Sequence, residues 1–532
     1  MTGLRGFVSR PVVAILAVTA LGAALRFVHL SHPDEFVFDE LYYAKAGCIL
    51  IGETDRTCRL DDTEKLFREQ RWDVGSYVHP DLGKWQIALG EKAFGMTSFG
   101  WRATSALAGT LVVLIGAVLA WTLFRNVVWT AVGGLFIAVD GMNLALSRTA
   151  LLDVHLQLWV AAGFLFLVLD RSWIERRSAV APATPTGAGA ALGSDGDDGG
   201  EAGDDADGEV PPRPEPPVYS PVWRPWRWAA GAAFGAAVAV KWSGAFALAA
   251  AVILAYLWET SRRRRRDPSV GRAVGRAVAR ESFGIVLALA FVPVLVYTAS
   301  WLPWFHHFGH DVVGEPVASL RALVSEHDQM WEYHRRTLQE FEEDDEGNVT
   351  PTHAYYSRPW KWPILARPVL FYSDRGKGDV AQISAIGNPA IAWASVVAVP
   401  YLALAWWRLG DWRAGMLLVA FAGQWLPWFA MSRPQFSFYL LPMTPFLALA
   451  VTYLLWKLSE ARIVVRDRET GVVATNPETG GPAVSRGRPY LPFVIAFVVA
   501  VIGLAVWFWP IVSAGRISDD RWRAIVWFRA WM

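Results

Sequence analysis

The chain has 532 residues, of which 53% are hydrophobic and 19% are charged. Soluble domains usually carry about 25% charged residues, so this composition, with long stretches almost free of charge, excludes an ordinary soluble protein. It predicts a polytopic membrane protein. The net charge of +1 says nothing useful about partners, and we expect no nucleic-acid partner.

Eleven apolar runs approach the length of about 20 residues that a transmembrane helix needs. They lie at 11–30, 101–124, 127–146, 150–170, 227–241, 243–259, 281–301, 389–407, 412–431, 436–457 and 490–511. No small-residue cleavage site follows the first run, so we interpret it as a transmembrane helix and not as a cleavable signal peptide. The fifth run is short and rich in Gly and Ala.

The basic residues between these runs give the orientation. Those expected inside are Arg171, Arg176, Arg177, Arg262 to Arg266, Arg408, Arg413, Lys457, Arg462, Arg466 and Arg468. With eleven spans and a cytoplasmic N-terminus, all of them face the cytoplasm, as the positive-inside rule requires. The same topology places 31–100, 302–388 and the tail 512–532 outside.

The predicted organisation therefore has five parts. Residues 1–177 hold the first four spans and the outer loop 31–100, and 221–301 hold the next three spans. An outer loop domain occupies 302–388, and the last spans and the tail occupy 389–532. Residues 178–220 are rich in Ala, Gly, Pro and acids and lack the apolar residues needed for a core, so we interpret them as a disordered cytoplasmic linker.

Six basic residues break the positive-inside pattern, because they fall at outer helix ends or in the outer loop. They are Arg26, Lys84, Arg102, Arg148, Lys241 and Arg433. A single such residue is usually a side chain that snorkels to the interface. Six together favour an anionic ligand such as a lipid phosphate, because a charge at the membrane edge is costly without a counter-charge.

Acidic residues cluster just after the first span, in HPDEFVFDELYYAK, where Asp39 and Glu40 follow an apolar run. Such a pair suits general-base chemistry, since burial and nearby cations tune the carboxylate pKa. A solvated acidic loop, or acids that neutralise the outer arginines, are equally good interpretations. Asp153 begins the fourth span, either as a helix N-terminal acid or as a partner for Arg148.

The only two cysteines, Cys48 and Cys58, lie in the same outer loop. They form either a disulfide that closes a short loop or two free thiols. Six histidines lie in 302–388, at positions 306, 307, 310, 327, 334 and 353. We interpret them as ordinary surface residues, because the sequence shows no convergence on a metal. We expect no essential metal or other cofactor.

Several long motifs resemble the protein O-mannosyltransferases, specifically their bacterial branch. They are HPDEFVFDELYYAK, VHPDLGKWQIALG, SRTALLD, AVKWSGAFAL, YYSRPWKWPILARPVLFY, IGNPAIAWASV and FSFYLLPMTPFLALA, in family order between His32 and Ala450. The resemblance implies an all-α polytopic GT-C fold with its active site in the outer loops. It also implies inverting transfer of mannose from a polyprenyl phosphate to Ser or Thr hydroxyls of translocated proteins at the cell membrane.

The resemblance also implies roles for individual residues. Asp39 is the expected base and Glu40 its supporting partner, while Arg102 corresponds to the family's second-helix arginine. We expect Arg102 and Lys241 to bind the donor phosphate, together with Arg148 and Arg433. The remaining site candidates, for the acceptor or other roles, are His79, Asp153, Trp242, Trp360 and Tyr439. The expected partners are polyprenyl phosphate mannose, secreted Ser/Thr-containing proteins, the bilayer and, at family level, the secretion translocon.

The chain departs from the eukaryotic pattern in two places. Residues 302–388 are too few for the β-trefoil repeats of eukaryotic members, and Ser76-Tyr77 stand where the family has Phe-Asp. Two other functions compete with the mannosyltransferase. A lipid-phosphate flippase would place charges near the bilayer midplane and show repeats between halves. The second is a lipid-linked glycosyltransferase that uses another sugar or acceptor. Only the family resemblance favours mannose and protein hydroxyls over it.

Overall fold

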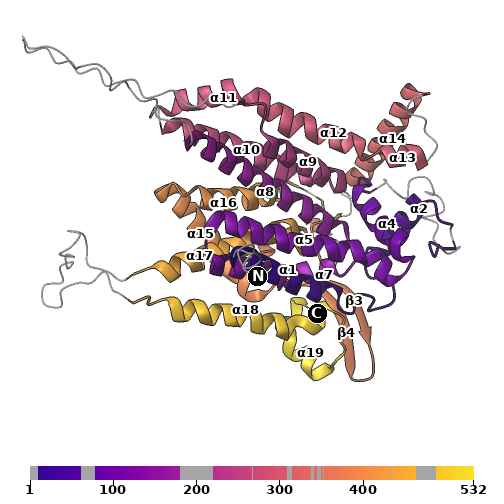
Figure 1. The fold of residues 1–532 in the computed structure, drawn as a ribbon. Helices are drawn as coiled ribbons and strands as arrows, with labels where there is room; N and C mark the ends of the chain where they lie inside the picture. The colour runs from indigo at the N-terminus through magenta and orange to yellow at the C-terminus, as the bar shows by residue number, and fades with distance from the viewer. Residues whose placement is uncertain are drawn as a thin grey trace, which may run out of the picture.

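The computed structural model is almost entirely helical, with long helices running side by side (Figure 1). It describes residues 10–54, 56–60, 78–179, 220–265, 268–307, 314–336, 341–343, 349–351, 353–431, 433–462 and 487–531. The predicted linker 178–220 therefore lies almost wholly outside the described residues, as do Ser76-Tyr77 and His310.

The N-terminal helices pack closely around α5. Their bounds are α1 (Arg10–Phe27), α5 (Ser98–Phe124), α6 (Val127–Ala138), α7 (Gly141–Ser147) and α8 (Leu152–Ala179). Small residues allow this packing. A Cβ on Gly134 would lie 2.6 Å from Val18 of α1, and a Cβ on Gly133 would lie 2.9 Å from Leu449. Glycine thus lets α6 approach helices on both sides, as in many membrane helix pairs.

The third predicted span is bent by 57° between α6 and α7. Asp140 lies at the break, where its Oδ1 accepts a hydrogen bond from the backbone N–H of Asn143 and begins α7. Its Oδ2 accepts a second one from the N–H of Asn388, which is distant in the sequence. A helix N-cap within an apolar run therefore explains the bend.

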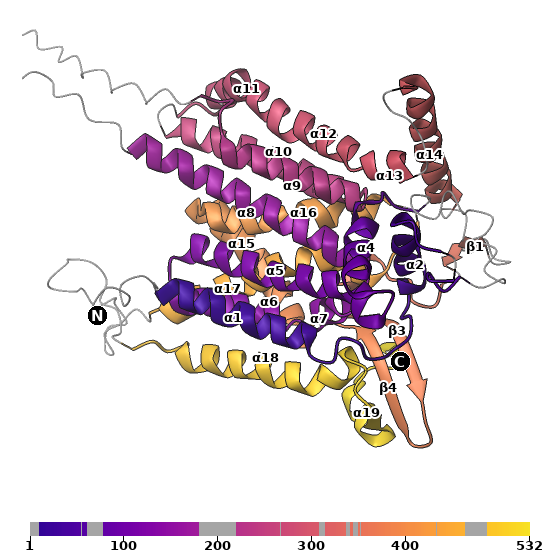
Figure 2. The ribbon, with the colours of Figure 1, turned by 45° about the vertical axis from the view of Figure 1, so that its right-hand side comes forward.

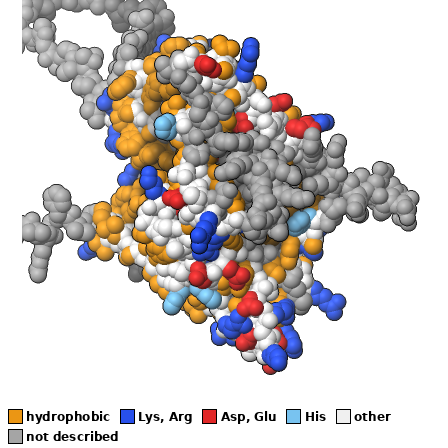
Figure 3. Space-filling view, turned by 90° about the vertical axis from the view of Figure 1, so that its right-hand side faces the viewer, with side chains coloured by type: hydrophobic (Ala, Val, Ile, Leu, Met, Phe, Trp, Pro, Cys, Tyr) orange, Lys and Arg blue, Asp and Glu red, His pale blue; other side chains and the backbone are white. Residues whose placement is uncertain are grey.

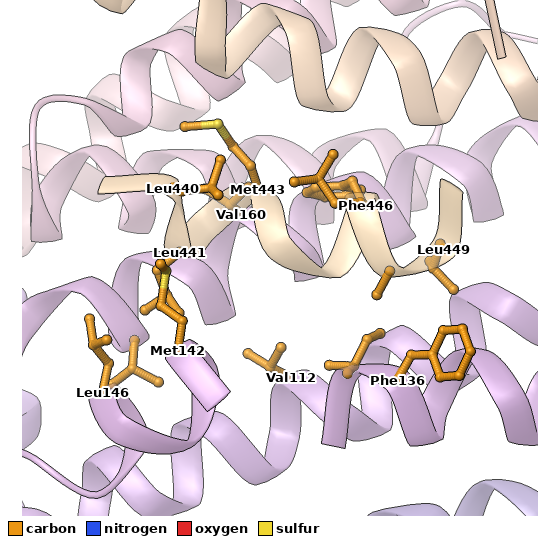
Figure 4. Packing of buried hydrophobic residues seen from close by; sticks show 14 of the residues in the cluster. Val112, Phe136, Met142, Leu146, Val160, Leu440, Leu441, Met443, Phe446 and Leu449 are labelled. Atoms are coloured by element: carbon orange, nitrogen blue, oxygen red, sulfur yellow. The ribbon is translucent and has the colours of Figure 1, made fainter. Parts of the chain in front are cut away.

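The remaining helices complete the bundle. They are α9 (Pro225–Val240), α10 (Gly244–Arg264), α11 (Val270–Val286), the π-turn η1 (Leu287–Phe291), α12 (Val292–Ala299), α15 (Pro389–Leu409), α16 (Trp412–Trp425), η4 (Leu426–Ala430), η5 (Ser437–Met443), α17 (Thr444–Glu460) and α18 (Leu491–Val512). The buried hydrophobic residues between α5, α6, α8 and α17 include Val112, Phe136, Val160, Phe446 and Leu449 (Figure 4). This layer joins the two halves of the chain.

Each of the eleven predicted spans coincides with helical structure, but their number as full spans is not confirmed. In the described residues, eight helices are long and apolar enough to cross a membrane, or nine if α6 and α7 are one bent span. The two that fall short are α9 and α16, with 16 and 14 residues. The sequence shows where the apolar runs are. Hydropathy alone does not show where a turn ends a helix early and makes it too short to span.

Short elements gather at one end of the bundle, on the right in Figures 1 and 2. They are α2 (Glu40–Leu50), α4 (Leu82–Phe94), α13 (Leu302–His307), α14 (Pro316–Arg336), β1 (Phe341–Glu343), β2 (Val349–Pro351), η3 (Pro359–Lys361), β3 (Val369–Arg375), β4 (Asp379–Ala385), β5 (Ile517–Ser518), α19 (Asp519–Ile525) and η6 (Arg529–Trp531). Strands β3, β4 and β5 form one antiparallel sheet and β1 and β2 another. The segments predicted as outer loops, 31–100 and 302–388, thus lie together.

Candidate active site

A pocket of about 390 Å³ opens at this end of the bundle. It brings together side chains from six separate segments: the loop before α4, the start of α8, the α9–α10 turn, α14, the end of α16 with η4, and the stretch through η5. The lining residues include His79, Asp153, Lys241, Trp242, Trp331, His334, Arg335, Gln424, Trp428, Arg433 and Tyr439. Figure 3 looks onto this end, where charged side chains and histidines lie among hydrophobic ones.

Lys241 and Asp153 form an ion pair in the pocket wall. Lys241 ends α9 in an extended conformation, and its Nζ lies 2.8 Å from Oδ2 of Asp153 in the first turn of α8. Both residues are more than nine-tenths buried. The Lys241 Nζ also lies 5.8 Å from the centre of the Tyr439 ring. Asp153 therefore pairs with Lys241, and its suggested pairing with Arg148 is wrong.

Asp39 lies beside this ion pair. It precedes α2, but its side chain makes no capping hydrogen bond, and no described residue donates a hydrogen bond to it. Burial raises the pKa of Asp39 to about 6, a rise that the Lys241 charge opposes and the Asp153 charge increases. The half-buried carboxylate is thus ionised at neutral pH and has a pKa close to that of an effective general base.

Glu40, the next residue, is fully buried, and both of its carboxylate oxygens accept hydrogen bonds. Its Oε1 accepts from Arg102 Nε at 2.8 Å and from the Ala150 N–H at 2.7 Å. Its Oε2 accepts from Arg102 Nη2, the Trp101 indole and the Val37 N–H. Glu40 therefore fixes the start of α2, next to Asp39, and offers no lone pair to a substrate.

Arg102 does not line the pocket, contrary to its expected role in donor binding. Besides the bidentate pair with Glu40, it donates to the backbone carbonyls of Leu30, Pro33 and Glu35 at 2.7–3.2 Å. Its exposed fraction is zero. We call this arrangement of Glu40, Arg102 and the three carbonyls the loop clasp. A guanidinium with its donors so engaged fixes the chain before α2 and leaves none for a phosphate.

Arg148 also departs from its expected role. It donates to the carbonyls of Leu25, Arg26 and Val28 through Nη1 and of His29 through Nη2, at 2.7–3.1 Å. It thereby caps the C-terminal end of α1, where cations are favourable. The donor-binding prediction for Arg148 overlooked this use, because unsatisfied carbonyls at a helix end are not visible in a sequence.

Arg433 lies in the pocket, as expected for a phosphate ligand. One Nη donates to Nδ1 of His334 at 3.1 Å and the other to the Tyr439 hydroxyl at 3.3 Å, while its buried Nε has no partner among the described residues. Of the six basic residues at the outer side, only Lys241 and Arg433 line the pocket. Lys84 donates to the carbonyl of His79 and pairs with Asp81, and Arg26 donates to Asn143 and to the Gly22 carbonyl.

Two histidines face these cations. Burial lowers the pKa of His79 well below its usual value, and Lys241, His334, Arg433 and Lys84 lower it further. Burial, followed by the Arg433 charge, lowers the pKa of His334 to about 4. Both rings are therefore neutral at pH 7 and can each donate and accept a hydrogen bond. The surface interpretation missed His334, since only the position of α14 over the pocket distinguishes it from its neighbours.

The aromatic candidates divide into two groups. Trp242 and Tyr439 line the pocket, and the Trp242 indole donates to the Tyr297 hydroxyl, which is hydrogen-bonded to His327. Trp360, in η3, is 51% exposed and does not line the pocket. Its neighbour Trp362 is buried instead, with its ring against those of Trp428 and Tyr439. The sequence identified the segment but not which indole faces inward.

Cys48 and Cys58 are bonded, which agrees with the disulfide alternative. The bond joins the end of α2 to the following loop. No group of three or more His, Cys, Asp or Glu side chains suited to a metal ion occurs in the part of the chain that the structure describes.

Family models match both ends of the chain. Residues 16–194 match the model for dolichyl-phosphate-mannose–protein mannosyltransferase, and residues 320–531 match the model for the C-terminal four-transmembrane region of protein O-mannosyltransferase. Together they contain Asp39, Asp153 and Arg433, whereas Lys241 lies between them.

Individual proteins agree with these matches. The polyprenol-phosphate-mannose–protein mannosyltransferase of Mycobacterium tuberculosis is 28% identical over 99% of this chain and 92% of its own length. That of Mycolicibacterium smegmatis strain MKD8 is 29% identical over 97% and 92%.

A similar fold is found in the structure of the S. cerevisiae protein O-mannosyltransferase Pmt1–Pmt2 complex bound to the sugar donor. That chain has a TM-score of 0.64 at 14% identity, over 99% of this chain and 93% of the other. The sequence motifs, the membrane-helix bundle and the comparisons agree, and the chain belongs to the protein O-mannosyltransferase family.

Proposed function

We propose that this protein transfers mannose from polyprenyl phosphate mannose to Ser and Thr hydroxyls of proteins, with Asp39 as the general base. One observation supports this most strongly. An ionised carboxylate that receives no hydrogen bond from a described residue lies beside a pocket in which Lys241 and Arg433 provide positive charge from two different segments. The names of the mycobacterial relatives give the same donor and a protein acceptor.

The residues have separate tasks in this reaction. Lys241 and Arg433 hold the donor phosphate, and Asp39 accepts the proton of the Ser or Thr hydroxyl. The hydroxyl oxygen forms a bond to the anomeric carbon from the face opposite the phosphate, while the bond from that carbon to the phosphate oxygen breaks. The polyprenyl phosphate leaves with the electron pair. Its growing negative charge is stabilised by cations that are already in place.

Asp153 and the neutral histidines complete the site. Asp153 orients Lys241 through the 2.8 Å ion pair and keeps the Lys241 charge from lowering the pKa of Asp39 too far. His334 holds Arg433 through Nδ1. Trp242 and Tyr439 offer flat surfaces on which a sugar or peptide can stack.

We place this reaction on the extracytoplasmic side of the cell membrane. The helices that contribute to the pocket carry their basic clusters at the opposite end, for example Arg262–Arg264 on α10 and Arg176 and Arg177 on α8. The positive-inside rule assigns that end to the cytoplasm. Acceptors would then be secreted proteins, and the secretion translocon is the expected source of their unfolded chains.

The proposal is tested with membranes, radiolabelled polyprenyl phosphate mannose and a Ser/Thr-rich peptide. Asp39→Asn should lower transfer by about 10²–10⁴-fold, the usual contribution of a positioned base, and leave the unfolding temperature unchanged. Asp520→Asn is the matched control, because the Asp520 side chain is 95% exposed on α19. Transfer by folded Asp39→Asn at the wild-type rate would move the base elsewhere, with Asp153 next.

We also propose that no metal takes part, since Lys241 and Arg433 supply the charge that a metal would otherwise provide. Excess chelator should leave the rate of mannose transfer unchanged. Loss of activity in chelator that Mg²⁺ or Mn²⁺ restores would contradict this.

A further inference from the structure

A second cavity, of about 450 Å³, lies at the other end of the bundle. It is lined by Leu167, Asp170, Arg171, Ile174, Glu175, Arg224, Arg227, Ala255, Trp258, Glu259, Arg262 and Arg265. Asp153 and Asp170 are both on α8 and 17 positions apart, so at 1.5 Å per residue the two cavities are about 26 Å apart along this helix. The second cavity is therefore separate from the active site, at the end that carries the basic clusters.

Most of the charges around this cavity satisfy one another. Asp170, Glu259 and Glu281, all nearly fully buried, accept hydrogen bonds from four arginines. Arg224 contacts all three, at 2.5 Å to Asp170, 2.6 Å to Glu259 and 3.2 Å to Glu281. Arg227 also lies 3.6 Å from Asp170. Arg227, Arg262 and Arg263 share the two glutamates. These contacts tie α8, α9, α10 and α11 together and already use the carboxylates.

Two further arginines that line the cavity make fewer ion pairs with the described residues. Arg171 is 8% exposed and pairs only with Glu175, whose side chain is 42% exposed, and the buried Nε of Arg171 has no hydrogen-bond partner among the described residues. Its guanidinium lies 4.5 Å from the ring centre of Trp412 and 5.3 Å from that of Trp258. Arg265 follows α10 as its C-cap, is exposed, and forms no ion pair with any residue that the structure describes. The lining thus holds five arginines and three acids, an excess of positive charge.

The geometry points to a binding site for a phosphate-bearing anion, with Arg171 and Arg265 as its ligands. Guanidinium groups match phosphate oxygens in pairs of hydrogen bonds, and such bonds are stronger than neutral ones. The unused Nε of Arg171 gives a buried donor, and Trp258 and Trp412 hold its side chain in position. A cavity of this size falls in the range of small-ligand sites, about 300–1,000 Å³. Either an anionic phospholipid headgroup or a free phosphate compound fits this chemistry.

The experiment uses the full-length protein in phosphatidylcholine nanodiscs. Sodium phosphate is titrated against sodium chloride at equal ionic strength, and a parallel set of nanodiscs contains phosphatidylglycerol. The midpoint of thermal unfolding is measured for wild type, Arg265→Gln and the matched control Arg264→Gln. Arg264 is the preceding residue on α10, is exposed and does not line the cavity.

Phosphate or phosphatidylglycerol should raise the unfolding midpoint of wild type and Arg264→Gln equally. Arg265→Gln should need about tenfold more anion for the same rise, because it lacks one charged ligand. A response to phosphate alone identifies a soluble ligand, and a response only to phosphatidylglycerol identifies a lipid headgroup. If neither anion stabilises the wild type, or if both variants weaken binding equally, the site does not exist as proposed.

Discussion

Asp39 and Glu40 are adjacent acids in two different environments. In the loop clasp, Glu40 accepts five hydrogen bonds and faces a guanidinium with no exposed surface. At the pocket, Asp39 receives no hydrogen bond from a described residue, and its pKa is raised to about 6. A carboxylate whose lone pairs are all used can only hold structure, whereas one with unused lone pairs and a raised pKa can take a proton. The difference separates a positioning residue from a catalytic one.

The largest effect is expected from breaking the loop clasp. Glu40→Ala leaves Arg102 buried without a counter-charge, and removal of one partner of a buried pair typically costs about 3–5 kcal/mol. The folded yield and the unfolding temperature should therefore fall sharply, together with activity. Glu53→Ala, at an exposed acid of the same outer segment, is the control and should unfold like wild type. A stable but inactive Glu40→Ala would give Glu40 a direct role in the reaction.

Replacement of the pocket cation Lys241 should slow the reaction, and because it also leaves the buried Asp153 without its ion-pair partner, the unfolding temperature is measured beside the rate. Lys241→Met removes charge at the donor phosphate and should lower kcat/KM by about 10²–10³-fold, as loss of one electrostatic stabiliser does. Lys241→Arg keeps the charge and should retain more activity. Transfer assays at several donor concentrations distinguish the variants. Equal activity of Lys241→Met and wild type would remove Lys241 from the donor site.

The smallest effect on the rate is expected from a change of pH. Asp39 must be ionised to accept a proton, so kcat/KM should be half-maximal at the pKa of about 6, level off about one pH unit above it, and fall tenfold per pH unit below it. The loss occurs as pH decreases, because protonation fills the lone pair that the base uses. Initial rates between pH 4.5 and 8 test this. A decline only below pH 4 would mean that Asp39 has the pKa of an ordinary exposed aspartate.

The same contrast explains what the motifs could and could not distinguish. The candidates Lys241, Asp153, Arg433, Trp242, Tyr439 and His79 line one pocket, and Asp39 lies beside it. The motifs did not distinguish these from Arg102 and Arg148, since all the arginines occupy similar positions at outer helix ends. The hydrogen bonds from Arg102 and Arg148 go to backbone carbonyls, and every residue has one. The local sequence therefore does not show which arginine is already hydrogen-bonded within the protein.

The sequence by itself determined the class of the protein, the places of its helical segments and its family, because apolar runs and long motifs are properties of the chain read in order. The tertiary structure decided which charges are used up inside the protein and which remain for a ligand. It separated Glu40 from Asp39, brought His334 to the pocket and left Trp360 at the surface. Burial and hydrogen bonding set the chemistry of each charged group, and both depend on residues that are far apart in the sequence.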